Sequence, residues 1–476
     1  MIRIERPGVA LIAAAAALRL FAAFTSIGFD HPNEPFRLLE PLASLQGWSA
    51  VLPWEWTQGL LSELPVRAQL PLARLFFALG LSPASQIIGL KALYALLSLL
   101  VVIASGNLAA AVSPPQLARR AQLCGYAIAA LWPELIYQSV RLMDYSLEAA
   151  LLAASWLLLT RGSRLDSGSR REGSANLLSG LILGLALFVR PQSGLHLIPL
   201  LVGAWAFSGT GRAQAMVCLG YGLASCAGGV IEFAVTSRPH AFFLQPLWNY
   251  FHFNAIEGGA ARDYGVAPAY RYLSDLAKYF GWFGFAAGLI ALGAAVKNVV
   301  KNTRQSLAPA FAEKWAQPRF RRTLALLFAF AFPALVHSLI AHKEARFLFG
   351  SLWLFIPAST AVALELLHGK PRKYAYALTL LLACGAVVSS ARASHRWLNR
   401  DADVRQFSAV SKLLPRTALE IQVHTDPVTF PAGFLLQRPG TLCYPDPNRP
   451  LFPCSSTPSG LPRINVVRGP DGWVKN

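Results

Sequence analysis

Long runs of apolar residues, separated by short polar segments, dominate this chain from its start to about residue 393. An apolar run of about 18 residues or more is long enough to cross a lipid bilayer as a helix. Hydropathy predicts about eleven spans, several of them shorter than a full crossing. They cover residues 8–29, 86–112, 122–140, 145–160, 176–190, 192–208, 214–235, 276–296, 323–341, 347–366 and 374–393. The pattern therefore predicts an all-α polytopic membrane protein that resides in the lipid bilayer.

The composition fits a membrane protein. Hydrophobic residues make up 54% of the 476 residues and charged residues only 14%, whereas soluble proteins carry about 25% charged residues. The formal net charge is +19, but the basic residues lie in alternate loops, which is the positive-inside pattern. These loops hold Arg3 and Arg6; Arg119 and Arg120; Arg161, Arg164, Arg170 and Arg171; Arg212; Lys297, Lys301, Arg304, Lys314, Arg319, Arg321 and Arg322; and Lys370, Arg372 and Lys373. The basic charge is thus explained by topology without nucleic acid, and it predicts a cytoplasmic N-terminus.

The opposite loops carry most of the acids and aromatic residues, and we expect them to face outward. Residues 30–85 and 236–275 form two long outer loops, which we predict to roof an active site. Within the first, apolar residues at helical spacing over 34–45 predict either an amphipathic helix in the membrane interface or a short soluble helix. We therefore assign residues 1–393 to a transmembrane body.

The tail, residues 394–476, is polar and rich in Pro and Gly. Strand-like pieces at 418–423, 433–436 and 464–467 predict a small outward domain of mixed or β-rich structure. A disulfide between Cys443 and Cys454 is allowed in an outward domain, but the sequence does not decide whether it forms. No Cys/His spacing typical of a zinc site is present.

The segment His342-Lys-Glu-Ala-Arg-Phe347 stands out because it places four ionisable side chains between two apolar runs. Charge at the mouth of two spans is costly to hold and usually marks a functional site. A His, two cations and an acid could bind a phosphate and manage a proton at the bilayer surface. The alternative is an ordinary polar loop.

This hexad resembles the His-Lys-Glu-x-Arg-Phe signature of glycosyltransferase family 22, the membrane mannosyltransferases that use a lipid-phosphate-linked mannose donor. The segment Phe29–Glu40 resembles the family's His-Pro-Asp-Glu-x-Phe-Gln-x-x-Glu pattern, with Asn33 in place of the Asp and Arg37 in place of the Gln. Weaker similarities follow in family order: Trp54-Glu-Trp56 with Arg67; Arg141, Ser146 and Glu148; Arg190-Pro191; Asn254, Gly258, Tyr264-Gly265, Pro268 and Tyr272; and His424, Pro427, Cys443 and Pro445.

The resemblance implies a GT-C fold and an inverting transfer of a hexose, most simply mannose, from a polyprenyl-phosphate donor to a lipid-linked or surface glycan acceptor. Such a displacement needs a base for the acceptor hydroxyl and positive charge for the leaving phosphate. Because Asn33 cannot be that base, either the neighbouring Asp30 or Glu34 takes the role, or the chain lacks this activity. The expected contacts to the donor phosphate and substrate are His342, Lys343, Arg346, Arg190, His31, Glu40 and Glu344, and the expected sugar contacts are Trp54, Trp56, Asn254 and Tyr264.

We expect no cofactor and no metal, since a lipid-phosphate donor lacks the pyrophosphate that usually recruits Mg²⁺ or Mn²⁺. Two other functions fit a membrane protein of this kind. One is a transporter or flippase of lipid-linked glycans, which predicts internal repeats and charges spread through several spans. The other is a GT-C transferase acting on lipid A or on protein hydroxyls. The Ala- and Arg-rich composition favours a bacterial inner-membrane protein with its site in the periplasm; oligomeric state is left open.

Overall fold

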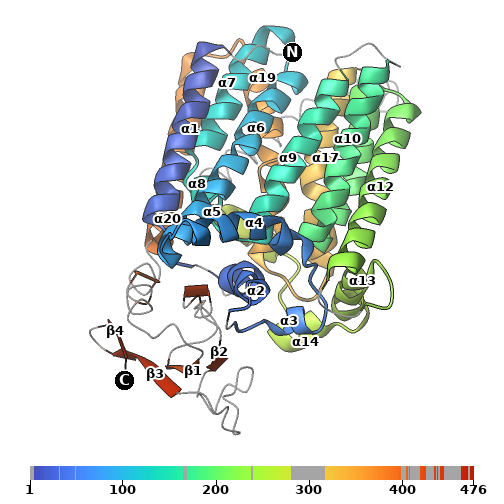
Figure 1. The fold of residues 1–476 in the computed structure, drawn as a ribbon. Helices are drawn as coiled ribbons and strands as arrows, with labels where there is room; N and C mark the ends of the chain where they lie inside the picture. Colours follow the sequence, from blue (N-terminus) through green and yellow to red (C-terminus); the bar gives the residue numbers. More distant parts are fainter. Residues whose placement is uncertain are drawn as a thin grey trace.

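The computed structural model describes residues 5–29, 31, 33–48, 50–163, 169–236, 240–279 and 317–397. In the tail it describes 404–405, 407, 419–424, 434–435, 437, 440–443, 463–469 and 472–475. The described part is a bundle of long helices with a small sheet beyond one of its ends (Figure 1). The long helices are α1 (Arg6–Thr25), α5 (Pro83–Leu97), α6 (Leu99–Val112), α7 (Pro115–Leu131), α9 (Asp144–Gly162), α10 (Arg170–Val189), α11 (Leu197–Ser208), α12 (Gly211–Val235), α17 (Pro318–Leu339), α19 (Phe355–Leu367) and α20 (Arg372–Trp397).

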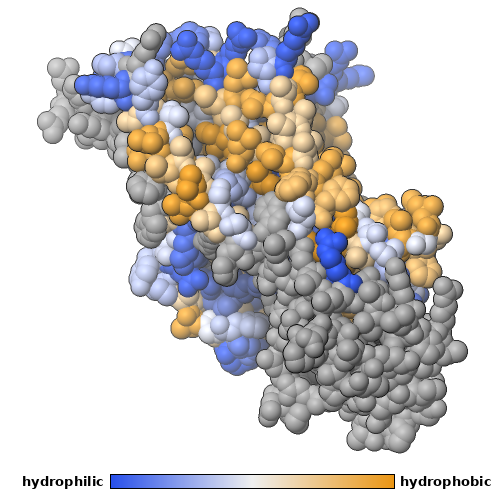
Figure 2. Space-filling model, turned by 90° about the vertical axis from the view of Figure 1, so that its left-hand side faces the viewer, coloured by the Kyte–Doolittle hydropathy of each residue, from blue (hydrophilic) through white to orange (hydrophobic). Residues whose placement is uncertain are grey.

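Six of the described helical segments are long and apolar enough to cross a membrane, and a bent pair at 345–352 and 355–367 would make a seventh. Each predicted span has a helix in the structure except 276–296, most of which lies outside the described residues. An apolar band runs across the middle of the bundle, with hydrophilic residues gathered at its upper end (Figure 2). The chain is therefore an integral membrane protein, as its apolar pattern predicts.

Arginine residues gather at one end of the bundle. Arg119, Arg161, Arg170, Arg212 and Arg319 lie at the ends of α7, α9, α10, α12 and α17 that meet at the top of the bundle (Figure 1). Helices α2 (Glu40–Leu45), α3 (Trp54–Thr57), α4 (Leu64–Ala78), α13 (Gln245–Phe251) and α14 (Gly259–Tyr264) lie at the opposite end (Figure 1). The other short elements are η1 (Pro35–Leu39), α8 (Pro133–Gln138), η2 (Pro191–His196), η3 (His252–Ile256), η4 (Ala345–Leu348) and α18 (Phe349–Leu352).

The apolar stripe predicted over 34–45 packs into protein rather than lipid. Phe36, Leu39 and Leu42 are buried in a core cluster that also contains Val66 and Leu70 of α4 and Ile87 and Leu90 of α5. The same cluster contains Phe407, Phe434 and Leu435 of the tail. The interfacial placement of this segment is therefore wrong, because the tail and α4 cover its apolar face.

The described tail strands form one sheet with the order β2-β1-β3-β4. The strands are β1 (Leu419–His424), β2 (Gly440–Cys443), β3 (Arg463–Gly469) and β4 (Gly472–Lys475). β1 pairs in parallel with β2 and β3, and β4 runs antiparallel to β3. The strands predicted at 418–423 and 464–467 are confirmed, but the piece at 433–436 is wrong, since residues 434–435 are helical. The Cys443–Cys454 bridge stays a prediction because Cys454 lies outside the described residues.

Candidate active site

The hexad is fixed to the second outer loop through its lysine. Lys343 is 8% exposed, and its Nζ donates hydrogen bonds to the carbonyls of Ala267 at 2.9 Å and Ile340 at 2.5 Å. The Ala267 amide in turn donates to the carbonyl of Ala341 at 3.0 Å. A buried ammonium requires such acceptors, so Lys343 holds the start of the hexad against residues 265–267.

Two buried cations fix the chain just after α1. Lys91 Nζ donates to the carbonyls of Ser26 and Gly28, both at 2.7 Å. Arg141 donates to the same two carbonyls, at 3.3 and 3.2 Å. Backbone carbonyls that follow a helix need donors when they are buried. Here the donors come from α5 and from the segment before α9, and they direct the chain toward His31.

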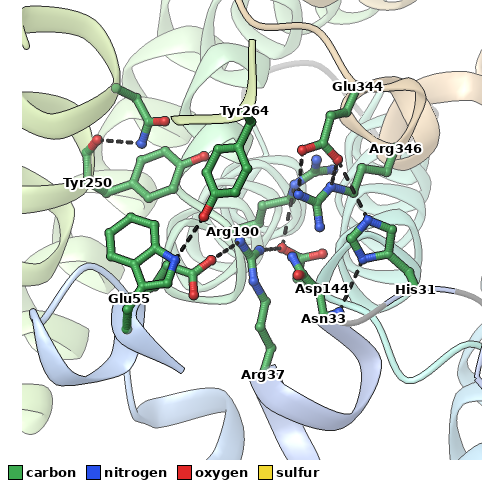
Figure 3. Close-up of polar contacts among 12 residues, drawn as sticks. His31, Asn33, Arg37, Glu55, Asp144, Arg190, Tyr250, Tyr264, Glu344 and Arg346 are labelled. Atoms are coloured by element: carbon green, nitrogen blue, oxygen red, sulfur yellow. Dashed lines mark hydrogen bonds and ion pairs between the residues drawn. The ribbon is translucent and has the colours of Figure 1, made fainter. Parts of the chain in front are cut away.

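The first outer loop and the hexad meet at one place, as their chemistry suggested (Figure 3). His31 Nε2 lies 3.9 Å from the Glu344 carboxylate. Glu344 also accepts hydrogen bonds from His342 at 2.9 Å and from Arg346 Nη2 at 2.7 Å. With its amide oxygen turned toward the cations, Asn33 accepts from Arg37 Nε at 2.9 Å and from Arg346. Asn33 thus serves as a neutral acceptor between two guanidinium groups.

A line of alternating charges continues from this meeting point into the bundle. Arg37 Nη1 lies 2.7 Å from Asp144 and Nη2 lies 3.5 Å from Glu55. Arg190 lies 3.8 Å from Asp144 and 2.7 Å from Glu148. Each acid lies beside at least one guanidinium, so each buried acid in the line has a cationic partner. The line therefore ties the first loop to α9 and α10.

Burial and neighbouring charge set the protonation of two groups outside the spans. Burial, followed by the positive charge of Arg346, lowers the pKa of His31 to about 4. Burial alone would raise the pKa of Glu344, but Arg346 and the hydrogen bonds from His342 and Arg346 lower it to about 2. Near neutral pH, His31 is thus uncharged and Glu344 is a carboxylate. A carboxylate held so firmly in its ionised form is a weak proton acceptor.

These segments surround a cavity of about 580 Å³, within the range of small-molecule sites. Its described lining comprises His31, Asn33, Phe36, Arg37, Pro53, Trp54, Glu55, Leu60, Arg190, Gln192, Tyr250, Phe253, Asn254, Ala260, Tyr264, His342, Lys343, Glu344, Arg346 and Phe347. Four cations and two carboxylates belong to this set, and Asp144 and Glu148 pair with Arg37 and Arg190 just outside it. The guanidinium groups of Arg37, Arg190 and Arg346 suit an anionic ligand such as a phosphate.

Aromatic rings from the two outer loops form another part of the cavity wall. Trp54 Nε1 donates a hydrogen bond to the Tyr264 hydroxyl at 2.8 Å, and its ring centroid lies 5.0 Å from that of Phe253. Tyr264 also approaches His342, with the ring centroids 5.7 Å apart. Asn254 lines the same wall and donates to the carbonyl of Tyr250 at 2.8 Å. The combination of rings and amides suits a sugar ring and its hydroxyls.

Several predicted site residues are absent from the described lining of the cavity. Asp30 lies outside the described residues. Glu34 is fully buried, 3.8 Å from Arg141, and accepts from the Leu142 amide. Glu40 is also fully buried and accepts from the amides of Val51 and Phe434. Trp56 belongs to the core around α2. Glu34, Glu40 and Trp56 are thus buried among protein groups and absent from the described cavity lining, and their contact with substrate stays a prediction.

Other residues reach the site without having been singled out. Asp144 at the start of α9 pairs with both Arg37 and Arg190. Glu55, which stands between Trp54 and Trp56 in the sequence, lines the cavity. Tyr250 and Gln192 line it as well and are hydrogen-bonded to each other. An acid in the first turn of a helix is a recognisable signal at Asp144, but its two partners lie 107 and 46 positions away in the sequence, so spacing alone could not have identified them.

Within the described ranges, no three His, Cys, Asp or Glu side chains are grouped as metal ligands would be. Metal independence therefore stays a prediction.

Residues 10–418 match the model of the Alg9-like mannosyltransferase family. Among curated proteins, no significant match is found. ArnT from Cupriavidus metallidurans bound to undecaprenyl phosphate is similar in structure, with a TM-score of 0.59 and 12% sequence identity over 97% of this chain and 93% of that chain. The apo form of the Archaeoglobus fulgidus oligosaccharyltransferase gives a TM-score of 0.54 and 12% identity over 91% of this chain and 64% of that chain. At this identity the likeness shows a shared fold, the polytopic GT-C type.

Proposed function

From the premise that this chain belongs to the Alg9-like mannosyltransferase family, we propose that it transfers mannose, with inversion, from a polyprenyl-phosphate donor to a lipid-linked or surface glycan. Family membership establishes a membrane glycosyltransferase that uses a lipid-linked sugar. The proposal adds the sugar, the acceptor and the stereochemistry. The observation that carries it is the shared cavity, where His31 and Asn33 of the first loop meet Glu344 and Arg346 of the hexad.

Arg346, Arg37 and Arg190 would bind the donor phosphate. All three line the cavity, and guanidinium groups recognise phosphate oxygens in pairs. In the reaction, the acceptor oxygen attacks the anomeric carbon and the bond from that carbon to the phosphate oxygen breaks. The polyprenyl phosphate leaves with the electron pair, and the nearby guanidiniums stabilise the charge that it gains. The bound undecaprenyl phosphate named for the ArnT structure supports a lipid phosphate as the leaving group.

A carboxylate must take the proton of the acceptor hydroxyl. We assign this role to Asp30, which directly precedes the cavity-lining His31. Glu55 is the second candidate because it lines the cavity and its side chain is 18% exposed. Glu34 is the weakest candidate, since it is fully buried beside Arg141.

The orientation of the protein in the membrane is also a proposal. The arginine-rich end of the bundle would face the cytoplasm and the cavity end the opposite side, which in a bacterium is the periplasm. We further propose that transfer needs no metal, because cations of the protein surround the cavity where the phosphate would lie.

The test uses purified protein in liposomes with labelled polyprenyl-phosphate-mannose and a membrane glycolipid extract. We expect labelled glycolipid with an inverted anomeric centre, and transfer that persists in excess chelator. Asp30→Asn should abolish transfer, Glu55→Gln should reduce it, and Glu34→Gln should lower protein yield more than the rate of the folded enzyme. Absence of transfer by the wild type with this donor, or full activity of Asp30→Asn, would overturn the donor or the base assignment, respectively.

A further inference from the structure

The segment formed by α13 and η3 has two different faces. Tyr250, Phe253 and Asn254 point to the cavity and line it. Trp248, Phe251 and Ile256 are turned away from it, with exposed fractions of 49%, 53% and 57%. Residues 250, 253 and 254 therefore face the cavity, whereas 248 and 251 lie on the exposed side of the segment. The segment is thus a wall one helix thick.

The residues that directly precede α13 fold back along helix α12, which is long and apolar enough to span a membrane. α12 ends at Val235, yet a Cβ placed on Gly229 would lie 2.6 Å from Phe243 and 2.8 Å from Leu244. Gly229 precedes the end of α12 by six residues, or about 9 Å of helical rise. Phe243 and Leu244 therefore pack against α12 well inside its length, immediately before α13 begins at Gln245.

The lipid-facing side of α12 continues onto this segment. Leu219, Leu223, Val230 and Phe233 of α12 are about half exposed, in a helix apolar enough to span a bilayer. Phe242 and Phe243, at 42% and 38% exposed, and then Trp248 and Phe251 extend the apolar surface toward the cavity end. Trp at the end of such a surface is typical of the boundary between headgroups and acyl chains.

We propose that the outer face of α13 and η3 lies in that boundary, in contact with phospholipid of the leaflet on the cavity side. Two contacts fix the segment there: Asn249 Nδ2 donates to the carbonyl of Gly59 at 3.2 Å, and Tyr250 is hydrogen-bonded to Gln192. One side of the cavity wall is then lipid-facing. If the proposed function holds, a lipid-linked substrate passes this wall sideways from the leaflet.

Photo-crosslinking tests the lipid contact without relying on activity. The photoreactive residue p-benzoyl-phenylalanine replaces Trp248, Phe251, Phe233 or Phe253 in the full-length protein, reconstituted in nanodiscs of radiolabelled phosphatidylethanolamine and phosphatidylglycerol. Phe233 of α12 is the positive control and the cavity-lining Phe253 the negative control. We expect lipid label on the proteins substituted at 233, 248 and 251, and at most background label at 253.

Label at 233 without label at 248 and 251 overturns the proposal, and a crosslinked dimer at 248 or 251 assigns the face to a second copy instead. A kinetic arm uses Trp248→Ser combined with Phe251→Ser. We expect the KM for a long-chain polyprenyl donor to rise several-fold, and the KM for a short-chain, water-soluble donor to stay unchanged. An equal rise for both donors contradicts lateral passage, whereas no transfer by the wild type speaks only against the proposed function.

Discussion

Arg37 and Asp144, separated by 107 positions in the sequence, form an ion pair with an Nη1 to carboxylate distance of 2.7 Å. The pair joins the first outer loop to the start of α9, and Arg190 approaches the same carboxylate to within 3.8 Å. One carboxylate therefore balances two guanidiniums that line the cavity.

Replacing Asp144 by Asn should lower both stability and activity. Arg37 and Arg190 would lose a shared anion in a largely buried place, where removing one partner of a buried pair costs about 3–5 kcal/mol. We expect a lower thermal midpoint and a decrease in kcat/KM of about tenfold or more, as the cations shift. The control is Asp263→Asn, whose exposed pair with Arg262 should contribute little. Equal effects of the two variants would contradict this role.

Gly350→Ala should displace Glu148 from Arg190. A methyl group at position 350 would overlap the Glu148 carboxylate, which accepts from Arg190 at 2.7 Å and from Ser193 at 2.8 Å. Overpacking of this kind costs about 1–3 kcal/mol. We expect a reduced thermal midpoint and weaker donor binding through Arg190. Gly222→Ala is the matched control, since nothing lies within 4 Å of its added methyl.

Substitutions of Lys343 and Arg346 should have different effects, the first on stability and the second on the KM for the donor. Three carbonyls surround the Lys343 ammonium, so Lys343→Met should lower the thermal midpoint and leave the KM of the folded enzyme within about threefold. Arg346→Lys should raise the KM for the donor by about tenfold, because a paired contact to phosphate is lost. A raised KM with a normal midpoint for Lys343→Met would return Lys343 to the phosphate site.

Glu40→Ala should weaken the attachment of the tail without changing catalysis. It would leave the buried amides of Val51 and Phe434 without this acceptor, at about 1–3 kcal/mol for each amide. We expect earlier protease cleavage of the tail and an unchanged kcat/KM for the intact protein. Glu365→Ala is the control, because its pair with Arg319 is exposed. A raised KM with normal stability would support the substrate contact predicted from the sequence.

Stability should fall on acidification in two steps. The pKa of His31 is lowered to about 4 in the folded protein, below its unfolded value of about 6.5. The folded state therefore binds the proton less well than the unfolded state. The contribution of His31 to the free energy of unfolding is lost as pH falls from about 6.5 toward 4. Glu344, with a pKa of about 2, contributes stability above about 4.5 that is lost as pH falls toward 2. Thermal melts between pH 4.5 and 7.5 should show a smaller slope for His31→Gln; an unchanged slope would contradict the first step.

The helices and the cavity-end segments could be predicted because apolar length and local charge are properties of neighbouring residues. Which side chain of a segment faces the cavity could not be predicted in this way. Residues 33 and 34 begin a helical stretch, where consecutive side chains diverge by about 100°. Asn33 thus faces Arg37 and Arg346, while Glu34 faces Arg141. Trp54 and Trp56, two positions apart in α3, diverge in the same way, one into the cavity and the other into the core.

The hydrogen bonds from Lys91 and Arg141 to the carbonyls of Ser26 and Gly28 have a consequence for biosynthesis. Lys91 and Arg141 follow these carbonyls by some 60 to 115 residues, so these two donors arrive after α5 and the turn before α9 have been inserted. The hexad emerges from the ribosome later still. A nascent chain that ends before Arg346 would therefore lack part of the cavity wall, so the complete cavity arises only near the end of membrane insertion.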